Sequence, residues 1–160
     1  MAIPSPILSG SSVRSCAFTL FNLNAYSPAE IKEAIEKVGV RRTRLPLLAS
    51  FMLAVIAGAS IGLGAVYFTV VASDADLSFA VGRVMGGLVF SLGISIVLVA
   101  GAELFTGNNL IVMAWASGDV STREMLRNWV IVYLGNLAGS LGLVVLAFYS
   151  HYTDLNGGRV

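Results

Sequence analysis

The stretch VMGGLVFSLGISIVLVAGAELFTGNNLIVMAWASG (residues 84–118) has 35 residues and a single charged side chain, Glu103. A continuous helix of that length would be about 52 Å long, whereas the hydrocarbon core of a bilayer is about 30 Å thick. The middle of the stretch supplies Gly107 as a helix breaker, and Thr106, Asn108 and Asn109 as polar side chains that bond local backbone. The pattern predicts an interruption, and a polar interruption inside a membrane is a candidate solute path.

The composition is that of an integral membrane protein. Of the 160 residues, 56% are hydrophobic and 12% are charged, and the mean hydropathy is +0.82. Uncharged stretches that can cross a bilayer cover residues 45–73, 84–102 and 128–153. Residues 104–118 are too few for a complete crossing, which takes about 17 to 25 residues. We therefore expect an all-helical membrane protein with three crossings.

The basic residues predict the orientation, because Lys and Arg are retained on the cytoplasmic side of a membrane. Eight basic residues lie on one side of the membrane, either before the first crossing or between the third stretch and the last crossing. Two lie on the opposite side. The eight are Arg14, Lys32, Lys37, Arg41, Arg42, Arg44, Arg123 and Arg127, and the two are Arg83 and Arg159. We expect a multi-pass protein of the plasma (inner) membrane with a cytoplasmic N-terminus. Residues 1–26 are expected to be a flexible tail, and residues 27–160 the membrane domain.

Two capping boxes mark where helices begin. Ser27 is followed three residues later by Glu30, and Ser121 by Glu124, so that each serine can cap a helix and each glutamate can bond back to the serine. The first box predicts a short amphipathic helix at the cytoplasmic surface that Gly39 closes. The second predicts the start of the last membrane helix.

Small and polar residues predict tight packing of the membrane helices. Three GxxxG motifs occur, at Gly58 and Gly62, Gly82 and Gly86, and Gly135 and Gly139. Asn136, near the centre of the last span, is expected to bond to a neighbouring helix. Trp129 and Tyr133 are interpreted as anchors at the membrane interface.

Two architectures fit the interrupted stretch from its residues alone. In the first, residues 84–102 cross completely and the following piece lies in the interface. In the second, a half-helix ends near Gly101, an irregular loop spans residues 103–107, and a second half-helix begins near Asn108. The second explains more residues, because Thr106, Asn108 and Asn109 would cap a half-helix whose N-terminus attracts an anion. A purely interfacial helix should also be amphipathic, whereas residues 110–116 are apolar all round.

The ionisable residues of the chain do not predict an enzyme. Glu103 is interpreted as a structural acceptor that holds the loop by bonding backbone N–H groups, since an exposed carboxylate would repel an anion. The alternative is a proton carrier or ligand. His151 is interpreted as a solvated histidine at the outer end of the last span. No HExxH motif, intramembrane aspartate pair or serine nucleophile elbow is present, and we expect no cofactor and no metal.

Three segments resemble the formate/nitrite transporter family, whose members are aquaporin-like channels for small monovalent anions. They are GGLVFSLG (86–93), GAELFTGNNL (101–110) and NWVIVYLGNLAGSL (128–141). The resemblance implies a broken second helix, an aquaporin-like half bundle and a homopentamer in which each subunit has its own pore. Family members have six membrane helices in two inverted repeats, and this chain matches the first. We expect the sequence to be part of a longer protein, with a half-size protein that pairs with another half as the alternative.

The resemblance also implies roles for individual residues. Phe90 would belong to one hydrophobic constriction of the pore, and Ile94 and Leu104 to a second. Thr106 would offer its hydroxyl to the solute or to a central histidine of the second repeat. The pore loop as a whole comprises Glu103, Phe105, Thr106, Gly107 and Asn108. The alternative for each residue is a structural role. Phe90, Ile94 and Leu104 would then only pack against other helices, and Thr106 would cap a helix.

The function that follows is a channel for formate, nitrite or a similar small anion, in which protonation accompanies passage. An aquaporin-like pore for neutral solutes is the alternative within the same class, although the paired Asn-Pro-Ala signature is absent. A non-transporting assembly subunit is the alternative from another class. The expected partners are the anion, the lipid bilayer and further copies of the chain, and no nucleic acid.

Overall fold

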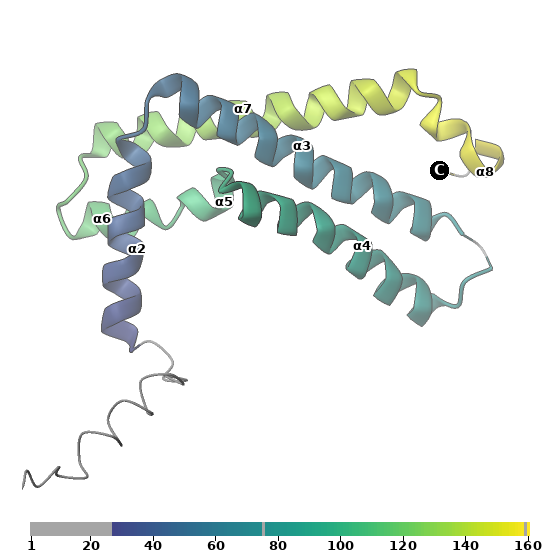
Figure 1. The fold of residues 1–160 in the computed structure, drawn as a ribbon, viewed down its shortest axis with the longest axis horizontal. Helices are drawn as coiled ribbons and strands as arrows, with labels where there is room; N and C mark the ends of the chain where they lie inside the picture. The colour runs from purple at the N-terminus through teal and green to yellow at the C-terminus, as the bar shows by residue number, and fades with distance from the viewer. Residues whose placement is uncertain (1–26, 75, 159) are drawn as a thin grey trace, which may run out of the picture. The chain divides into compact units, whose positions relative to one another are not determined.

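The structure is a computed structural model that describes residues 27–160 except 75 and 159. The described elements are all helical: α2 (Pro28–Thr43), α3 (Leu47–Ala72), α4 (Phe79–Ala100), α5 (Phe105–Asn108), α6 (Ile111–Ala116), α7 (Thr122–Tyr149), the 3-10 helix η2 (Tyr152–Asp154) and α8 (Leu155–Gly158) (Figure 1). The described residues belong to two units, which divide between Ile31 and Lys32. The predicted tail, residues 1–26, lies outside the described residues.

In the first unit the predicted capping box is present. The backbone N–H of Ser27 donates to Glu30 Oε2 over 2.7 Å, and the N–H of Glu30 donates to Ser27 Oγ over 3.3 Å. These bonds occupy donors that would otherwise be unpaired at the start of α2. The prediction of this helix start is confirmed.

Among the described residues, three helices are long and apolar enough to cross a membrane, as predicted from the sequence. They are α3 with 26 residues, α4 with 22 and α7 with 28. The start of α7 carries the second predicted capping box, in which the N–H of Glu124 donates to Ser121 Oγ and the N–H of Ser121 donates to Glu124 Oε2. Much of the apolar surface of these helices is exposed within the isolated chain.

Glycines bring α3 into close contact with both other spans. A Cβ at Gly58 or Gly139 would collide with the backbone across the α3–α7 contact, at Asn136 and Val55 respectively. A Cβ at Gly93 would lie 2.6 Å from the carbonyl oxygen of Ser60 across the α3–α4 contact. Small residues therefore allow helix backbones to touch, as predicted for two of the GxxxG motifs. Gly82 differs, since the nearest atom to its added Cβ is 3.9 Å away.

The prediction that Gly39 closes the amphipathic helix is wrong. The helix α2 continues to Thr43, and Gly39 is a buried residue inside it. A Cβ at Gly39 would lie 3.2 Å from Ala114 Cβ and 3.5 Å from Ile111 Cα. Gly39 is therefore needed for contact with α6 and not for ending the helix.

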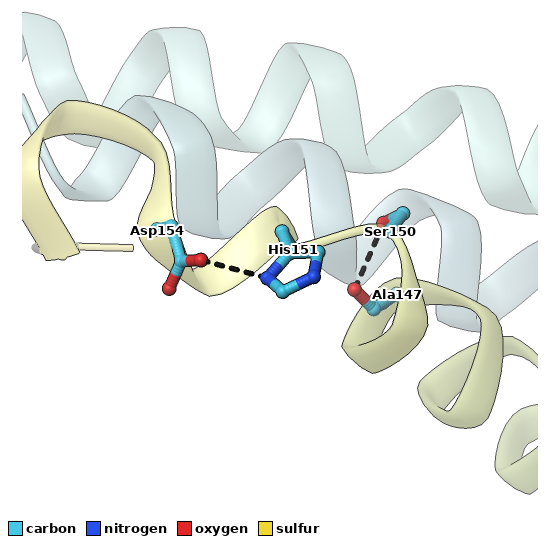
Figure 2. Close-up of polar contacts among 4 residues, drawn as sticks. All are labelled: Ala147, Ser150, His151 and Asp154. Carbon is cyan, nitrogen blue, oxygen red and sulfur yellow. Dashed lines mark hydrogen bonds and ion pairs between the residues drawn. The ribbon is translucent and has the colours of Figure 1, made fainter.

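The C-terminal end of α7 turns at His151, whose φ of 55° is the only positive value among the described residues other than glycine. Its side chain is 82% exposed, and Nδ1 lies 2.9 Å from Asp154 Oδ2, next to the bond from Ser150 Oγ to the carbonyl of Ala147 (Figure 2). The interpretation of His151 as a solvated residue agrees with this exposure.

Candidate functional site

The helix α4 ends at Gly101, and the predicted break in the second membrane helix is confirmed. Gly101 has φ 61°, a left-handed conformation that glycine adopts without steric cost. Its N–H donates to Leu98 O over 3.3 Å, and the N–H of Ala102 donates to Val97 O over 3.0 Å. These bonds satisfy carbonyls at the end of α4 and turn the chain out of the helix.

The predicted boundaries of the loop are wrong. The non-helical residues are 101–104, and α5 begins at Phe105 and not near Asn108. Gly107 lies inside α5, so the helix breaker is Gly101. The residue before α5 is Leu104, which has no side-chain cap, so Thr106, Asn108 and Asn109 do not cap this helix. The polar side chains of the loop are used for contacts with other helices instead.

Asn136 of α7 holds the break in place with three hydrogen bonds. Its Nδ2 donates to the carbonyl oxygens of Ala54 and Glu103, over 2.8 and 2.9 Å, and its Oδ1 accepts from the N–H of Phe105 over 2.9 Å. The N–H of Glu103 donates to Leu53 O over 3.3 Å. The predicted interhelical bond of Asn136 is confirmed, and it reaches the loop backbone as well as α3. Because Asn136 is near the middle of α7, the break lies level with the middle of that span.

Buried polar side chains form a hydrogen-bonded network around Asn108, at the end of α5. Glu103, Asn108 and Asn128 are buried, with exposed fractions of 2%, 0% and 4%. Asn108 Nδ2 donates to Glu103 Oε2 over 3.3 Å and to Asn128 Oδ1 over 2.9 Å, while Asn108 Oδ1 accepts from Arg42 Nη1. Glu103 is thus a buried acceptor, as interpreted, but its carboxylate bonds to a side-chain amide and not to the predicted backbone N–H groups.

Aromatic residues of α7 pack on the loop. The ring of Phe105 makes edge-to-face contacts with Trp129 and Tyr133, with centroids 6.0 and 5.7 Å apart. Trp129 Nε1 also donates to the carbonyl of Asn108 over 3.0 Å. The sequence interpretation of Trp129 and Tyr133 as interfacial anchors missed this role. Their spacing of four residues, which places both on one helix face, is the signal that points to it.

The residues expected to line a pore lie at different places around the break. Leu104 is half-buried and borders a groove of about 710 Å³ between α3 and α7, whose lining includes Gly58, Tyr133 and Asn136. Phe90 and Ile94, on α4, are not among the residues that line this groove. Phe90 packs against Gly64 of α3, and Ile94 is 42% exposed. Thr106 is exposed, and no described residue bonds its hydroxyl.

A membrane helix that is interrupted by a polar loop, with the loop secured to two neighbouring spans, is an arrangement of channels and transporters. The sequence over residues 29–158 matches the family model described as formate/nitrite transporter. The chain belongs to this family.

Two relatives and one solved structure illustrate the similarity. The formate channel FocA of Haemophilus influenzae is 35% identical over 136 residues, covering 84% of this chain and 48% of the relative. FocA of Escherichia coli strain K12 is 38% identical over 132 residues, covering 81% and 46%. A structure described as a pentameric formate channel with formate bound has a TM-score of 0.65 and 43% identity, and the match covers 71% of this chain and 45% of that one. The chain thus spans about half the length of the relatives it matches.

Proposed function

We propose that the protein to which this chain contributes is a channel for a small monovalent anion, with formate as the first candidate and nitrite as the second. The observation that carries the proposal is the loop at the break of α4 in a member of the formate/nitrite transporter family. There Leu104 borders the groove between α3 and α7, and two residues later Thr106 has an exposed hydroxyl without a bond to any described residue. That hydroxyl is available to a solute.

The groove that Leu104 borders is mostly apolar, and this favours passage with a proton. Moving a bare carboxylate into an apolar surrounding costs far more than moving the neutral acid. A hydroxyl such as that of Thr106 can donate to an anion and accept from an acid, so it suits both forms of the solute. We propose that Phe90 belongs to one constriction of the pore and Ile94 and Leu104 to a second, and that formate acquires a proton near the second.

The proposal includes the assembly and its location. The relatives named above are formate channels, and the solved structure is described as a pentamer. We propose a homopentamer in the plasma (inner) membrane with the N-terminus in the cytoplasm, in agreement with the distribution of basic residues. Cross-linking of the purified protein in detergent tests the pentamer, and a dominant species of another size would contradict it.

Uptake into proteoliposomes tests the transport function. Formate, nitrite and glycerol are offered at two pH values, both to the chain and to the product of the longest reading frame that contains it. We expect uptake of formate and nitrite, with formate faster at the lower pH. Uptake of glycerol at the rate of formate would indicate a pore for neutral solutes, and uptake of no solute by either protein would indicate an assembly subunit.

A pair of variants at one position tests the role of the loop. Thr106→Val removes the hydroxyl and keeps the branched shape, whereas Thr106→Ser keeps the hydroxyl. Loss of one hydrogen bond of about 1 kcal/mol predicts about a fivefold lower formate flux in the valine variant. The serine variant should retain the flux. Equal flux in both variants and the wild type would overturn the proposed role of Thr106.

A further inference from the structure

The helix α2 contacts the chain segment that follows the break at three successive positions along one face. Glu36 accepts a hydrogen bond from Ser117 Oγ, just after α6. Gly39 lies against Ala114 and Ile111 of α6. Arg42 donates through Nη1 to Asn108 Oδ1, at the end of α5. Residues three apart on a helix share a face. One face of α2 therefore packs along the segment from Asn108 to Ser117.

The Arg42 contact differs from the other two because it leads to a buried charge. Glu103 is 2% exposed, and a buried carboxylate is costly unless it is bonded and has an opposite charge nearby. The salt bridges of the described residues do not include Glu103. One link from its carboxylate to a cation runs through the side-chain amide of Asn108. That amide donates to Glu103 through Nδ2 and accepts from Arg42 through Oδ1. Its dipole therefore connects the two charges.

Asn108 also contributes to holding α5 in place. A helix of four residues does not hold its own shape, so its position follows from its contacts. Asn108 accepts through its backbone carbonyl from Trp129 and donates through Nδ2 to Asn128, and the carbonyl of Arg42 accepts from Asn128 Nδ2 over 3.5 Å. Removing Arg42 would leave Asn108 Oδ1 without its partner and remove one of the bonds that hold the amide.

We infer that Arg42 is a positioning residue of the pore loop, which acts through the Asn108 amide on Glu103 and so couples α2 to the break in α4. The structural part of the inference stands on the contacts alone. Its consequence for transport rests on the proposed function. The two parts are therefore measured separately, by amide exchange and by flux.

Hydrogen–deuterium exchange of the purified full chain in detergent tests the structural part. In Arg42→Ala we expect amides of residues 103–110 to exchange about tenfold faster, as the loss of a charge-assisted hydrogen bond implies. Amides in the middle of α3 should be unchanged. Arg42→Lys, which retains a charged donor, should restore part of the protection. The matched control is Arg41→Ala, since Arg41 is an exposed neighbour on α2; it should have no effect.

A double-mutant cycle distinguishes an effect through Asn108 from general loss of stability. If Arg42 acts through that amide, Arg42→Ala should change exchange of residues 103–110 little in an Asn108→Leu background. Additive effects of the two substitutions, or equally faster exchange in α3 and the loop, would overturn the inference. If Arg42→Ala does not fold, the comparison of Arg42→Lys with wild type in both backgrounds gives the same test.

Flux measurements test the transport part. Arg42→Ala should lower formate uptake several-fold, and Arg41→Ala should leave it unchanged. Altered exchange with unaltered flux in a conducting protein would overturn the coupling to transport. If neither the chain nor the product of the longest reading frame that contains it takes up formate, while the chain shows the expected exchange, the proposed function is contradicted and the positioning role remains supported.

Discussion

Replacing Asn136 should remove the bonds that join the loop and α3 to the middle of α7. Asn136→Leu keeps four side-chain heavy atoms branched at Cγ and removes three hydrogen bonds, to Ala54, Glu103 and Phe105. Interhelical bonds of this kind in membranes contribute about 0.6 kcal/mol each on average and up to about 1.7. The free energy of unfolding should therefore fall by about 2 kcal/mol, or about 30-fold in the equilibrium constant.

Asn136→Asp should be more harmful than Asn136→Leu at neutral pH. Its carboxylate still accepts from Phe105, but an oxygen now faces the carbonyls of Ala54 and Glu103, and two acceptors in contact repel each other. Unfolding is measured by titration with sodium dodecyl sulfate in mixed micelles, with fluorescence of the two tryptophans as the signal. The matched control is Ser140→Ala, because Ser140 lines the same groove and bonds only to Leu137 of its own helix.

Two outcomes would refute the reasoning about Asn136. A stability of Asn136→Leu equal to that of Ser140→Ala would mean that the three bonds contribute nothing net. If the leucine variant were less stable than the aspartate variant, the packing of the side chain, and not its hydrogen bonds, would determine the free energy of unfolding. Formate uptake should fall in both Asn136 variants and remain in the control.

Two further pairs of variants test the packing and the helix start. Gly139→Ala should lower stability by about 1 to 3 kcal/mol, because its Cβ would collide with Val55, whereas Gly142→Ala, with no atom within 4 Å, should raise it by up to about 1 kcal/mol. Equal effects in the same detergent titration would contradict the α3–α7 contact. Ser121→Ala removes the cap of α7 and should cost about 1 kcal/mol, whereas Ser150→Ala, beyond the other end, should cost less; the reverse order would count against the capping box.

Local signals predicted the parts of the fold that depend on local chemistry. Hydropathy identified the spans, and the serine-glutamate spacing located the start of α7 at Ser121. The site of the break could not be located equally well, because Gly101 and Gly107 are both plausible breakers. Which glycine turns the chain is decided by distant partners, the carbonyl of Leu53 and the side chain of Asn136.

The candidate site shows the same division between local and distant causes. The polar residues of the loop were identified from the sequence, but Asn108 was interpreted as a helix cap. In the structure its side chain bonds to Arg42 and Asn128, which are distant in the sequence. Trp129 was interpreted as an anchor, although its ring packs on Phe105. Polar groups beside a helix break satisfy either the local backbone or other helices. Only the packing of α2 and α7 on the loop decides between these uses.

The network also resolves a conflict in the site, namely a carboxylate next to a proposed path for an anion. An isolated carboxylate at Glu103 would repel the solute. In the structure its oxygen faces Asn108, and the guanidinium of Arg42 lies on the other side of that amide, so the cluster carries an opposite charge for the carboxylate. The neighbouring Thr106 then presents a neutral, exposed hydroxyl. An anchoring role of Glu103 is therefore compatible with the proposed path for an anion, and the proposed coupling makes the field at the loop depend on Arg42 of α2.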